Sequence, residues 1–498
     1  MCTKSSELFR NFLSVFKKKH CSKRGKGVKL LHTLGASQGI RFHHSYERRE
    51  KMKKRGILAL ALALLLAVSM LAACGGSSGG GSTPAGSGAA SGGDLAGTIK
   101  IGYVNPTTGA LAGNGEGCDW VVKRLTQWVA DNGGITIDGK QYGINVIVYD
   151  SESDSSKCSE MAQKLIEEDD VDMMIAIQTP ETVIPVAATA ERYGVPCVAI
   201  QAPVNPVAAN VAGGDQTEWV FEAFWTIEKV YEAHKALWTA AGYGPGSGAK
   251  VGLAFANDAD GSAWHDIFCE LLPKDGYVVV DPGMYPSGSD DFTSIAATYK
   301  SQNIDVLAGT NIPPDFLKLY KACIGAGVQA GCVTMGKCCL LDGDVAVLEN
   351  DTQGLANGIM TEVWWQPNYP FTSAVTGEAS QAIGDAYLAD TGRNMPQPAG
   401  YAYAALELAI NAFQNAGTLD KEAVRDALAA TDLDTVVGPI KYDQEMMGLT
   451  YGDTVIAGGQ WQLQDDGTEK LVVIDNTVYS NIDLPITGEY KAGTALNK

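Results

Sequence analysis

Apolar runs with the length of strands alternate with amphipathic segments with the length of helices from Thr98 onward. The first runs predict strands at 98–104, 142–149, 171–177 and 195–200. Apolar residues at helical spacing predict helices between them, at 119–132, 156–168 and 184–193. Strands and helices that alternate at this length favour a parallel sheet covered on both faces.

The alternation starts again after a long helical stretch predicted at 218–241. Further strands are predicted at 250–255, 277–280 and 306–309, with helices at 262–272, 292–302 and 316–326. More helix is predicted at 358–365, 374–391, 401–416 and 421–430, before short strands from Val436. About 400 residues are too many for one compact core, so we expect an α/β fold with two lobes.

A segment with the features of an export signal precedes this body. Lys53-Lys54-Arg55 supplies positive charge, 57–68 is an apolar run, and Leu71-Ala-Ala-Cys74 follows. The run is short for a membrane-spanning helix, which needs about 20 residues. Residues 52–74 resemble a bacterial lipoprotein signal, and the resemblance implies that Cys74 carries a diacylglycerol after cleavage. An uncleaved anchor helix is the alternative.

The residues on either side of this signal are not expected to build a core. Met52 stands where such a signal should begin, so residues 1–51 are interpreted as an upstream extension. Residues 75–93 contain only Gly, Ser, Ala, Thr and Pro, which predicts a flexible linker. A G-x-S-x-G pattern at 35–39 has no companion acid and histidine loops, so it is not interpreted as a hydrolase nucleophile.

Charge and side-chain chemistry exclude several classes of function. The formal net charge is −19 although residues 1–55 are basic, so the rest of the chain is expected to repel nucleic acid. Of six His, only His234 and His265 follow the linker, and the Cys residues there form no Cys-x-x-Cys pair with zinc spacing. We therefore expect no metal site, no cofactor and no catalytic residue. A GxxxxGK[ST] loop for ATP is absent from the sequence as well.

Six segments follow one another in the order found in a known family. They include Ile99-Lys-Ile-Gly-Tyr-Val-Asn-Pro-Thr-Thr-Gly109, 149–154, 291–294, 304–309, Thr435-Val-Val-Gly-Pro-Ile440 and 459–462. Together they resemble the Leu/Ile/Val-binding proteins, which are the type I periplasmic binding proteins of amino-acid ABC importers. The resemblance implies two lobes joined by three crossings, near 212–221, Met335 and Val436. Lobe one would hold 95–220 plus 336–435, and lobe two would hold 221–335 plus 436–498.

Ligand-binding residues are expected beyond the carboxyl ends of the strands, where two facing lobes enclose a cleft. The candidates in lobe one follow the first, third and fourth strands: Thr107, Thr108, Gln178, Thr179, Thr182, Gln201 and Ala202. Amides at a helix start suit a carboxylate, and the resemblance implies that Thr179 and Thr182 bind it with their hydroxyls. Simple helix capping by these threonines is the alternative. Pro203 stands where the family often has a hydroxyl, which argues against an unmodified branched-chain ligand.

The candidates in lobe two are Asn257, Asp258, Asn311, Asp315 and Trp364. The resemblance implies that Asp315 meets the ammonium group of the ligand, as a paired buried charge. Helix capping by Asp315 is the alternative. Trp364 and Trp365 are adjacent, so they would point to opposite faces of a strand and only one would face the cleft. Packing of Trp364 against the lobe surface is its alternative.

The resemblance implies an extracytoplasmic binding protein that closes over an amino acid or similar small amphipathic molecule. It would deliver this ligand to the membrane permease of an ABC importer, and the lipid on Cys74 would hold it at the outer face of the membrane. Two other functions stay open. The chain could present its ligand to a membrane kinase or chemoreceptor, or it could be a surface-anchored enzyme, which the sparse histidines disfavour.

Overall fold

Two large sheets organise residues 95–212 and 216–496, the part of the chain that the computed structural model describes. These residues belong to one compact unit, Ala90–Lys498. The predicted extension (1–51), signal with Cys74 (52–74) and linker (75–93) lie outside the described residues. None of the helices within 95–212 and 216–496 is both long enough and apolar enough to cross a membrane.

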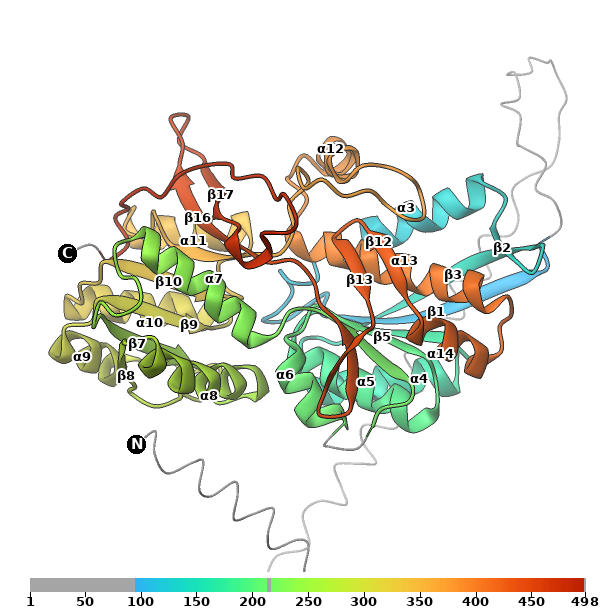
Figure 1. Ribbon diagram of the computed structural model, residues 1–498, viewed down its shortest axis with the longest axis horizontal. Helices are drawn as coiled ribbons and strands as arrows, with labels where there is room; N and C mark the ends of the chain where they lie inside the picture. Colours follow the sequence, from blue (N-terminus) through green and yellow to red (C-terminus); the bar gives the residue numbers. More distant parts are fainter. Residues whose placement is uncertain (1–94, 213–215, 497–498) are drawn as a thin grey trace, which may run out of the picture. The chain divides into compact units, whose positions relative to one another are not determined.

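The first sheet has eight strands in the order β14-β15-β6-β5-β4-β1-β3-β2 (Figure 1). They are β1 (Gly97–Asn105), β2 (Ile135–Ile137), β3 (Lys140–Asp150), β4 (Met173–Ile177), β5 (Cys197–Ile200), β6 (Val220–Ala223), β14 (Gln444–Met446) and β15 (Leu449–Gly452). The strands from β15 to β3 run parallel, and β2 and β14 are antiparallel edges. Every residue of β4 and β5 is buried, which explains why these strands read as continuous apolar runs.

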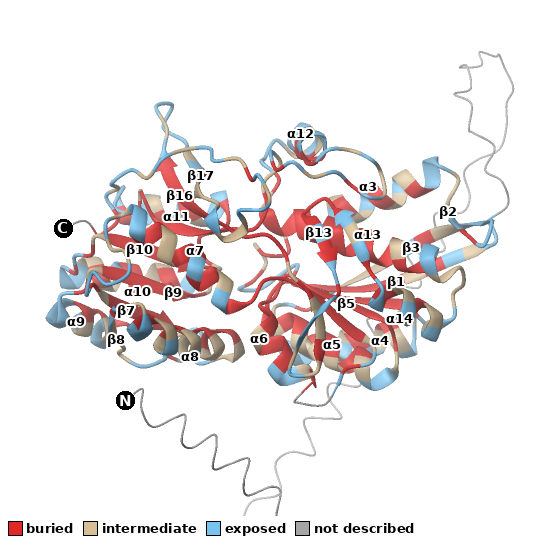
Figure 2. Cartoon of the chain, viewed as in Figure 1, coloured by how far each residue is buried: buried red, intermediate tan, exposed pale blue. Residues whose placement is uncertain are grey.

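Helices cover both faces of this sheet. They are α3 (Cys118–Asp131), α4 (Ser155–Glu167), α5 (Pro180–Tyr193), α6 (Val204–Val207), the π-helical turn η2 (Ala208–Ala212), α13 (Gln397–Ala416) and α14 (Lys421–Ala429). Alternate residues of β1 enter different cores: Tyr103 packs with Leu125 of α3, whereas Val104 packs with Leu165 of α4. The buried side of each helix accordingly faces the sheet (Figure 2).

The second sheet has seven strands in the order β17-β16-β11-β10-β9-β7-β8. They are β7 (Lys250–Phe255), β8 (Val278–Val280), β9 (Val306–Thr310), β10 (Cys332–Gly336), β11 (Met360–Val363), β16 (Ala457–Leu463) and β17 (Glu469–Asp475). Its helices are α7 (Ile227–Ala240), α8 (Ala259–Lys274), α9 (Thr293–Gln302), α10 (Pro313–Ala326) and α11 (Asp342–Thr352). The strands from β8 to β11 are parallel, and β16 and β17 are antiparallel. The two predicted α/β lobes are therefore confirmed.

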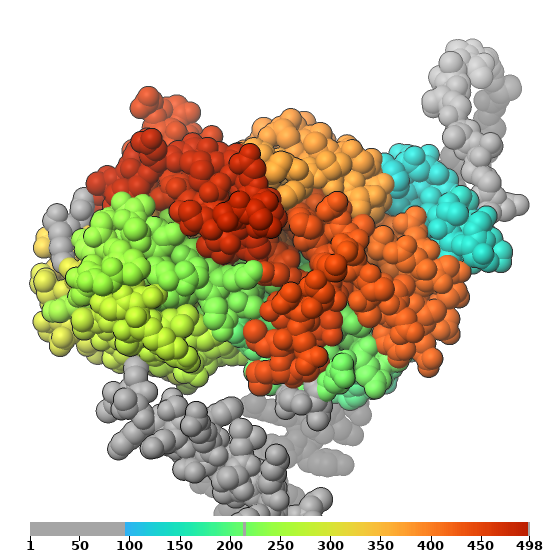
Figure 3. Space-filling model, viewed as in Figure 1, coloured from blue at the N-terminus to red at the C-terminus, as the bar shows by residue number. Residues whose placement is uncertain are grey.

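The remaining elements lie between and over the two sheets. They are α12 (Ser380–Thr391), the two-stranded pair β12 (Asp432–Thr435) and β13 (Gly438–Lys441), and the 3-10 turn η3 (Thr477–Tyr479). The C-terminal tail returns onto α7, where the Lys229 ammonium donates to the hydroxyl of Tyr479 at 2.7 Å and lies 4.4 Å from its ring centre. Figure 3 shows these last residues, in red, lying against the green surface of the α7 region.

Two of the predicted lobe boundaries differ from the sheet order. The chain crosses at 224–226 close to the expected place, but it then stays in the second sheet through β11 and leaves it only after Val363. It crosses a third time at 453–456, after β15 has joined the first sheet. The segment from 336 to 363 thus belongs with lobe two, and 436–452 belongs with lobe one. Both errors concern four-residue strands, which periodicity cannot separate from helix.

The same limitation explains two wrong element assignments. The predicted helix at 358–365 contains the strand β11, whose four residues are all buried. The predicted long helix at 218–241 contains β6 and begins as α7 only at Ile227. In both cases the strand pairs with neighbours that are distant in sequence, β10 and β16 for β11 and β5 and β15 for β6.

Close approach of β7 and β9 makes Gly309 sensitive to substitution. A Cβ at this position would overlap with the main-chain carbonyl of Ala254 on β7. We expect Gly309→Ala to lower the free energy of unfolding by about 2 kcal/mol or more, measured by urea denaturation. Gly325→Ala in α10 is the control, because nothing lies within 4 Å of its added Cβ. It should be neutral or stabilising by up to about 1 kcal/mol, and equal losses in the two variants would contradict the strand packing.

Candidate functional site

An internal cavity lies where the carboxyl ends of strands from both sheets meet. Its lining comprises Asn114, Gln178, Thr179, Pro180, Gln201, Pro203, Phe224, Trp225, Asp260, Trp264, Thr310, Lys337, Glu362 and Trp364. The volume open to the centres of water-sized molecules is about 20 Å³, which is room for one water. The lining side chains therefore fill most of the space between the strand ends.

Five buried polar atoms around this cavity have no hydrogen-bond partner among the described residues. Two can accept a hydrogen bond: Gln201 Oε1 and Asp260 Oδ1. The other three are indole N–H donors, on Trp225, Trp264 and Trp364. A buried polar group without a partner costs about 1–3 kcal/mol, and such groups are rare in native proteins. Their concentration at one cavity indicates a place where a bound molecule supplies the missing partners.

The Lys337 side chain joins the two halves of the site. Its ammonium group lies 2.6 Å from Asp260 Oδ2 on α8, and 3.4 Å from Glu181 Oε2 on α5. Burial alone would lower the pKa of Lys337, but the carboxylates of Asp260, Glu181 and Asp258 raise it above its ordinary value. Lys337 is therefore held in its charged form between carboxylates that belong to different lobes.

The same cluster shifts the acids in opposite directions. Burial raises the pKa of Asp260 to about 7, although Lys337 acts against this rise, and the charges of Glu181 and Asp258 add to it. Burial also acts to raise the pKa of Glu181, but the Lys337 ammonium and several hydrogen bonds bring it below its ordinary value. Of these two carboxyl groups, Asp260 is therefore the one that accepts a proton at the higher pH.

Three residues at strand ends adopt left-handed backbone conformations. Gln178 after β4 has φ 98°, Gln201 after β5 has φ 65°, and Lys337 after β10 has φ 63°. Non-glycine residues rarely adopt positive φ, and such strain gathers at functional sites. The side-chain amide of Gln201 donates to Gln178 Oε1 at 2.8 Å, and that of Gln178 donates to Asn105 Oδ1 at 3.4 Å. This amide chain leaves the Gln201 oxygen without a partner at the cavity.

Aromatic rings form the apolar wall of the cavity. Trp364 meets Phe224 edge to face at 5.1 Å, and Trp225 meets Trp264 in the same way at 6.1 Å between ring centres. Trp365 packs away from the cavity, because its indole donates to the carbonyl of Val436 at 2.8 Å. The main-chain amides of both Trp364 and Trp365 donate to Gln397 Oε1, at 2.6 and 3.3 Å. Gln397 thereby fixes which of the two indoles reaches the cavity.

Four of the residues proposed from the sequence line the cavity together: Gln178, Thr179, Gln201 and Trp364. Thr182 is buried nearby, but its hydroxyl donates to the carbonyl of Ile177 at 2.8 Å and accepts from the Thr179 amide at 3.1 Å. Thr179 is the N-cap residue of α5, and the two threonines form a capping box, which is the capping role that was the alternative for both. Ala202 is buried beside Gln201 and is not among the lining residues.

Thr107 and Thr108 lie in an exposed turn rather than at the cavity. The carboxylate of Asp150 at the end of β3 accepts from the amides of both residues, at 3.0 and 3.2 Å, and from the Thr108 hydroxyl at 2.7 Å. Asn257 is exposed as well, and its amide donates to the Tyr285 carbonyl. The polar residues that follow these strands therefore bond to neighbouring atoms and do not line the cavity.

The other three candidates of lobe two are engaged in local structure. Asp258 begins α8, where its side chain accepts from the Gly261 amide at 2.8 Å. The Asn311 amide donates to the Ala254 carbonyl at 3.2 Å. Asp315 is fully buried: its Oδ2 accepts from the Gly288 amide at 2.8 Å, whereas its Oδ1 has no hydrogen-bond partner among the described residues, and Asp315 is not among the residues that line the cavity. Burial raises the pKa of Asp315.

Sequence reasoning missed several lining residues, among them Asp260, Lys337, Trp225 and Trp264. The strand β10 was not predicted, so its end was not searched, and Lys337 follows that end directly. Asp260 lies two residues past the proposed Asp258, and helical geometry turns it toward the cavity. Lys337 could have been found with the rule that we applied to the other strands, because polar residues that directly follow a buried run are expected to face the cleft.

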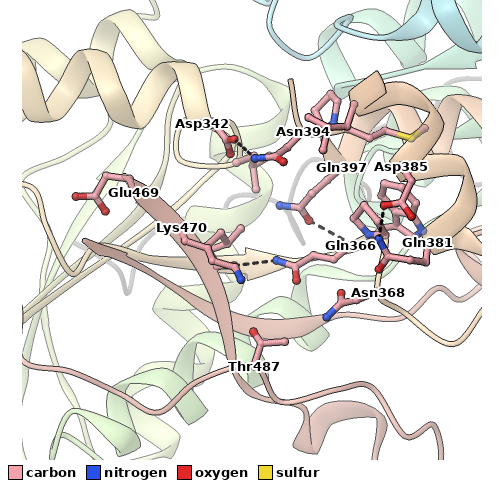
Figure 4. A pocket seen from close by; sticks show the side chains of 18 residues that line it. Asp342, Gln366, Asn368, Gln381, Asp385, Asn394, Gln397, Glu469, Lys470 and Thr487 are labelled. Atoms are coloured by element: carbon pink, nitrogen blue, oxygen red, sulfur yellow. Dashed lines mark hydrogen bonds between the residues drawn. The ribbon is translucent and has the colours of Figure 1, made fainter. Parts of the chain in front are cut away.

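A second, larger pocket opens nearby at the surface. Its volume is about 310 Å³, and it is bordered by residues near α12, α13 and β17 (Figure 4). Most of its labelled polar side chains already have partners: Asn394 donates to Asp342 at 3.0 Å, Gln381 to Asp385 at 2.8 Å, and Gln366 to the carbonyl of Leu471 at 3.1 Å. Two buried atoms at its border, Gln397 Nε2 and Glu469 Oε2, lack partners within the described chain, fewer than the five at the inner cavity. We therefore place the candidate site at the inner cavity.

The ion pair of Lys337 yields a stability prediction. Lys337→Met leaves Asp260 and Glu181 as buried carboxylates without their cation, so the free energy of unfolding at pH 7 should fall by about 3 kcal/mol or more. Lys321→Met is the matched control, because Lys321 pairs with Asp351 in solvent, with side chains 48% and 43% exposed. It should change stability by less than about 1 kcal/mol. Similar small changes for both, in urea denaturation, would rule out a structural role for the Lys337 pair.

Comparison with known proteins agrees with the two-lobe fold. Residues 98–453 match the family model described as periplasmic binding protein. The chain is similar to a leucine-binding protein from Thermotoga maritima (TM-score 0.61, 17% identity, 76% of this chain and 99% of that one). It is also similar to a solute-binding protein from R. palustris in complex with 4-hydroxybenzoate (TM-score 0.60, 19% identity, 76% and 96%).

The chain is also similar to a substrate-binding protein from Desulfitobacterium hafniense in complex with Leu. The TM-score is 0.55 and the sequence identity 15%, and the match covers 75% of this chain and 100% of that one. At these identities the solved structures show a shared fold, the two-lobe type I fold expected from the resemblance to Leu/Ile/Val-binding proteins, which is thereby confirmed. The family match extends over well more than half of the sequence. The chain belongs to the periplasmic binding protein family.

Proposed function

We propose that this chain is the extracytoplasmic substrate-binding component of an ABC importer, and that it captures an amino acid or similar small amphipathic molecule between its lobes. The observation that carries the proposal is the set of five buried polar atoms without partners, contributed by both lobes to one cavity. The similar proteins with bound leucine or 4-hydroxybenzoate support the class of ligand, which has an anionic end and an apolar body.

The lining residues suggest how such a ligand would lie. The indole N–H groups, the Thr179 hydroxyl and the Lys337 ammonium can donate to a carboxylate. Asp260 Oδ1 and Gln201 Oε1 can accept from an ammonium or a hydroxyl group. Rings of Phe224 and the tryptophans would contact the apolar body. Asp260, rather than Asp315, is the carboxylate that reaches the cavity, so we assign it the ammonium-binding role.

Ligand entry requires movement, because the cavity has room for about one water. Separation of the lobes would break the contact between Lys337 and Glu181, and closure over a ligand would restore contacts from both sides. A ligand that touches both lobes favours the closed state by its differential affinity. Closure, in this proposal, presents the loaded protein to a membrane permease, and the ligand is released chemically unchanged.

We also propose that a lipid on Cys74 holds the protein at the outer face of the membrane. The support is the sequence around Cys74, which lies outside the described residues. Membership of a periplasmic binding protein family implies an extracytoplasmic location in any case. Two acyl chains give stable anchoring, whereas one chain gives marginal binding.

The binding proposal is tested by calorimetry and tryptophan fluorescence with a panel of amino acids and hydroxylated aromatic acids. We expect at least one compound to bind and to raise the melting temperature, and to be recovered unchanged by mass spectrometry. Asp260→Asn should weaken binding of an amine-bearing ligand by at least about tenfold, as expected for loss of a buried charge partner. Asp315→Asn is the paired variant and should leave affinity within about twofold. A larger effect from Asp315, or chemical conversion of the ligand, would contradict the proposal.

The anchoring proposal is tested in bacterial cells by membrane fractionation and labelling with a fatty-acid analogue. The parent chain should label and sediment with membranes, and Cys74→Ala should not label, because the thioether has no sulfur to form on. Ser77→Ala in the linker is the control and should behave as the parent does. Labelling that persists in Cys74→Ala would show that another residue carries the lipid.

A further inference from the structure

A second group of functional side chains lies on the outer side of lobe two. His265 and Cys269 are four residues apart on α8, so both project from the same face of the helix. Asp281 directly follows β8, against which α8 packs. His265 Nε2 lies 3.2 Å from Asp281 Oδ2 and 3.6 Å from Cys269 Sγ, and all three ligand atoms lie within 4.8 Å of one another.

These distances match the edges of a tetrahedral metal site. Zinc binds histidine nitrogen at about 2.0–2.1 Å, carboxylate oxygen at about 2.0–2.2 Å and thiolate sulfur at about 2.3 Å. Tetrahedral angles then separate nitrogen from oxygen by about 3.4 Å and nitrogen from sulfur by about 3.6 Å. The two separations from His265 Nε2 lie within a few tenths of an ångström of these values, and the sulfur and the carboxylate oxygen lie within 4.8 Å of each other. A cation at Nε2 is therefore within reach of both other ligands after side-chain adjustment.

The surroundings also suit a metal ligand. The Nδ1 atom of His265 lies 3.4 Å from the carboxylate of Asp266, which can hold the imidazole in the orientation that leaves Nε2 for the metal. His265 and Asp281 are 16% and 18% exposed, so solvent reaches the cluster and water can fill a fourth position.

Cys269 differs from the other cysteines of the described chain. Seven of the eight are buried, and Cys269 alone is partly accessible within residues 95–212 and 216–496. Burial raises the pKa of thiols such as Cys158, to about 11, and Cys323, to about 12, which keeps them protonated and inert. Cys269 instead is partly exposed, and its sulfur lies 3.6 Å from His265 Nε2, so a metal bound to the imidazole can reach it.

We propose that His265, Cys269 and Asp281 bind a thiophilic divalent cation such as Zn²⁺, with water as the fourth ligand. Bonds form from the metal to nitrogen, sulfur and oxygen, and any protons that these ligand atoms carry pass to solvent. The bound cation fastens α8 to the end of β8. Since α8 begins at the ligand cavity with Asp260 and Trp264, the metal stabilises the helix that carries two lining residues.

The test uses the full chain after removal of metals by a chelator. Calorimetry with Zn²⁺ and spectroscopy with Co²⁺ are applied, because a Co²⁺–thiolate bond gives a near-ultraviolet charge-transfer band. Residues 1–74 also contain His and Cys, so the measured quantity is the difference between the parent and each variant. We expect Cys269→Ser to remove the band that this site contributes, and Cys269→Ser and His265→Ala each to lower the affinity of one Zn²⁺ site at least about tenfold.

Glu270→Gln is the matched control, because Glu270 adjoins Cys269 on α8 but pairs with Lys274 in solvent. It should keep both the Co²⁺ band and the Zn²⁺ affinity. Zn²⁺ should also raise the melting temperature of the parent more than that of Cys269→Ser. The same Zn²⁺ affinity and Co²⁺ spectrum in the parent, Cys269→Ser and His265→Ala would overturn the site. Circular dichroism of each variant establishes that a lost signal does not come from unfolding.

Discussion

The ammonium group of Lys337 is the point at which the two lobes share a charge. A buried ammonium loses its hydration, and only well-placed carboxylates make its burial tolerable. Asp260 from one lobe and Glu181 from the other provide them. Since these acids depend on Lys337 in turn, the relative position of α5, α8 and the end of β10 is constrained by one three-membered cluster. The polar groups that pack around this cluster are held in orientations that leave several of them without hydrogen-bond partners.

Such a cluster also suits a protein that must open and close. The contact of Lys337 with Asp260 is short and lies within one lobe, whereas its contact with Glu181 is longer and crosses between lobes. In the proposed opening, the longer contact would be the one that breaks. Lys337 can therefore stay paired with Asp260 in both states, which avoids a fully unpaired buried charge during movement. The hydrogen bond from the Trp364 amide to Gln397 helps to position the wall of the cavity beside this cluster.

Much of the architecture follows from local pattern, and much of the site does not. The apolar runs of β4 and β5 are legible because both faces are buried, and the residues after them, Gln178, Thr179 and Gln201, reach the cavity as the rule for parallel sheets predicts. The rule does not distinguish a side chain that faces the cleft from one that serves its own turn. Asp315 was chosen on position and resemblance, but its carboxylate holds the Gly288 amide.

The missed features depend on contacts between segments far apart in the sequence. The four residues of β11 are a strand only because β10 and β16 lie on either side of them. Trp225 reaches the cavity because the chain leaves the first sheet immediately before it, and no periodicity marks that point. The His265, Cys269 and Asp281 cluster escaped a search for paired cysteines because its third member comes from a different element.

The left-handed backbones of Gln178, Gln201 and Lys337 limit how such a pocket can be redesigned. A search for variants that bind a different ligand would normally vary the residues at strand ends first, with all twenty amino acids. At these three positions valine, isoleucine and threonine would strain the main chain, whereas glycine and asparagine fit it. A combinatorial library aimed at altered ligand binding should therefore place its aromatic and aliphatic substitutions at Phe224, Trp225, Trp264 and Trp364. These four shape the chamber without carrying a positive φ.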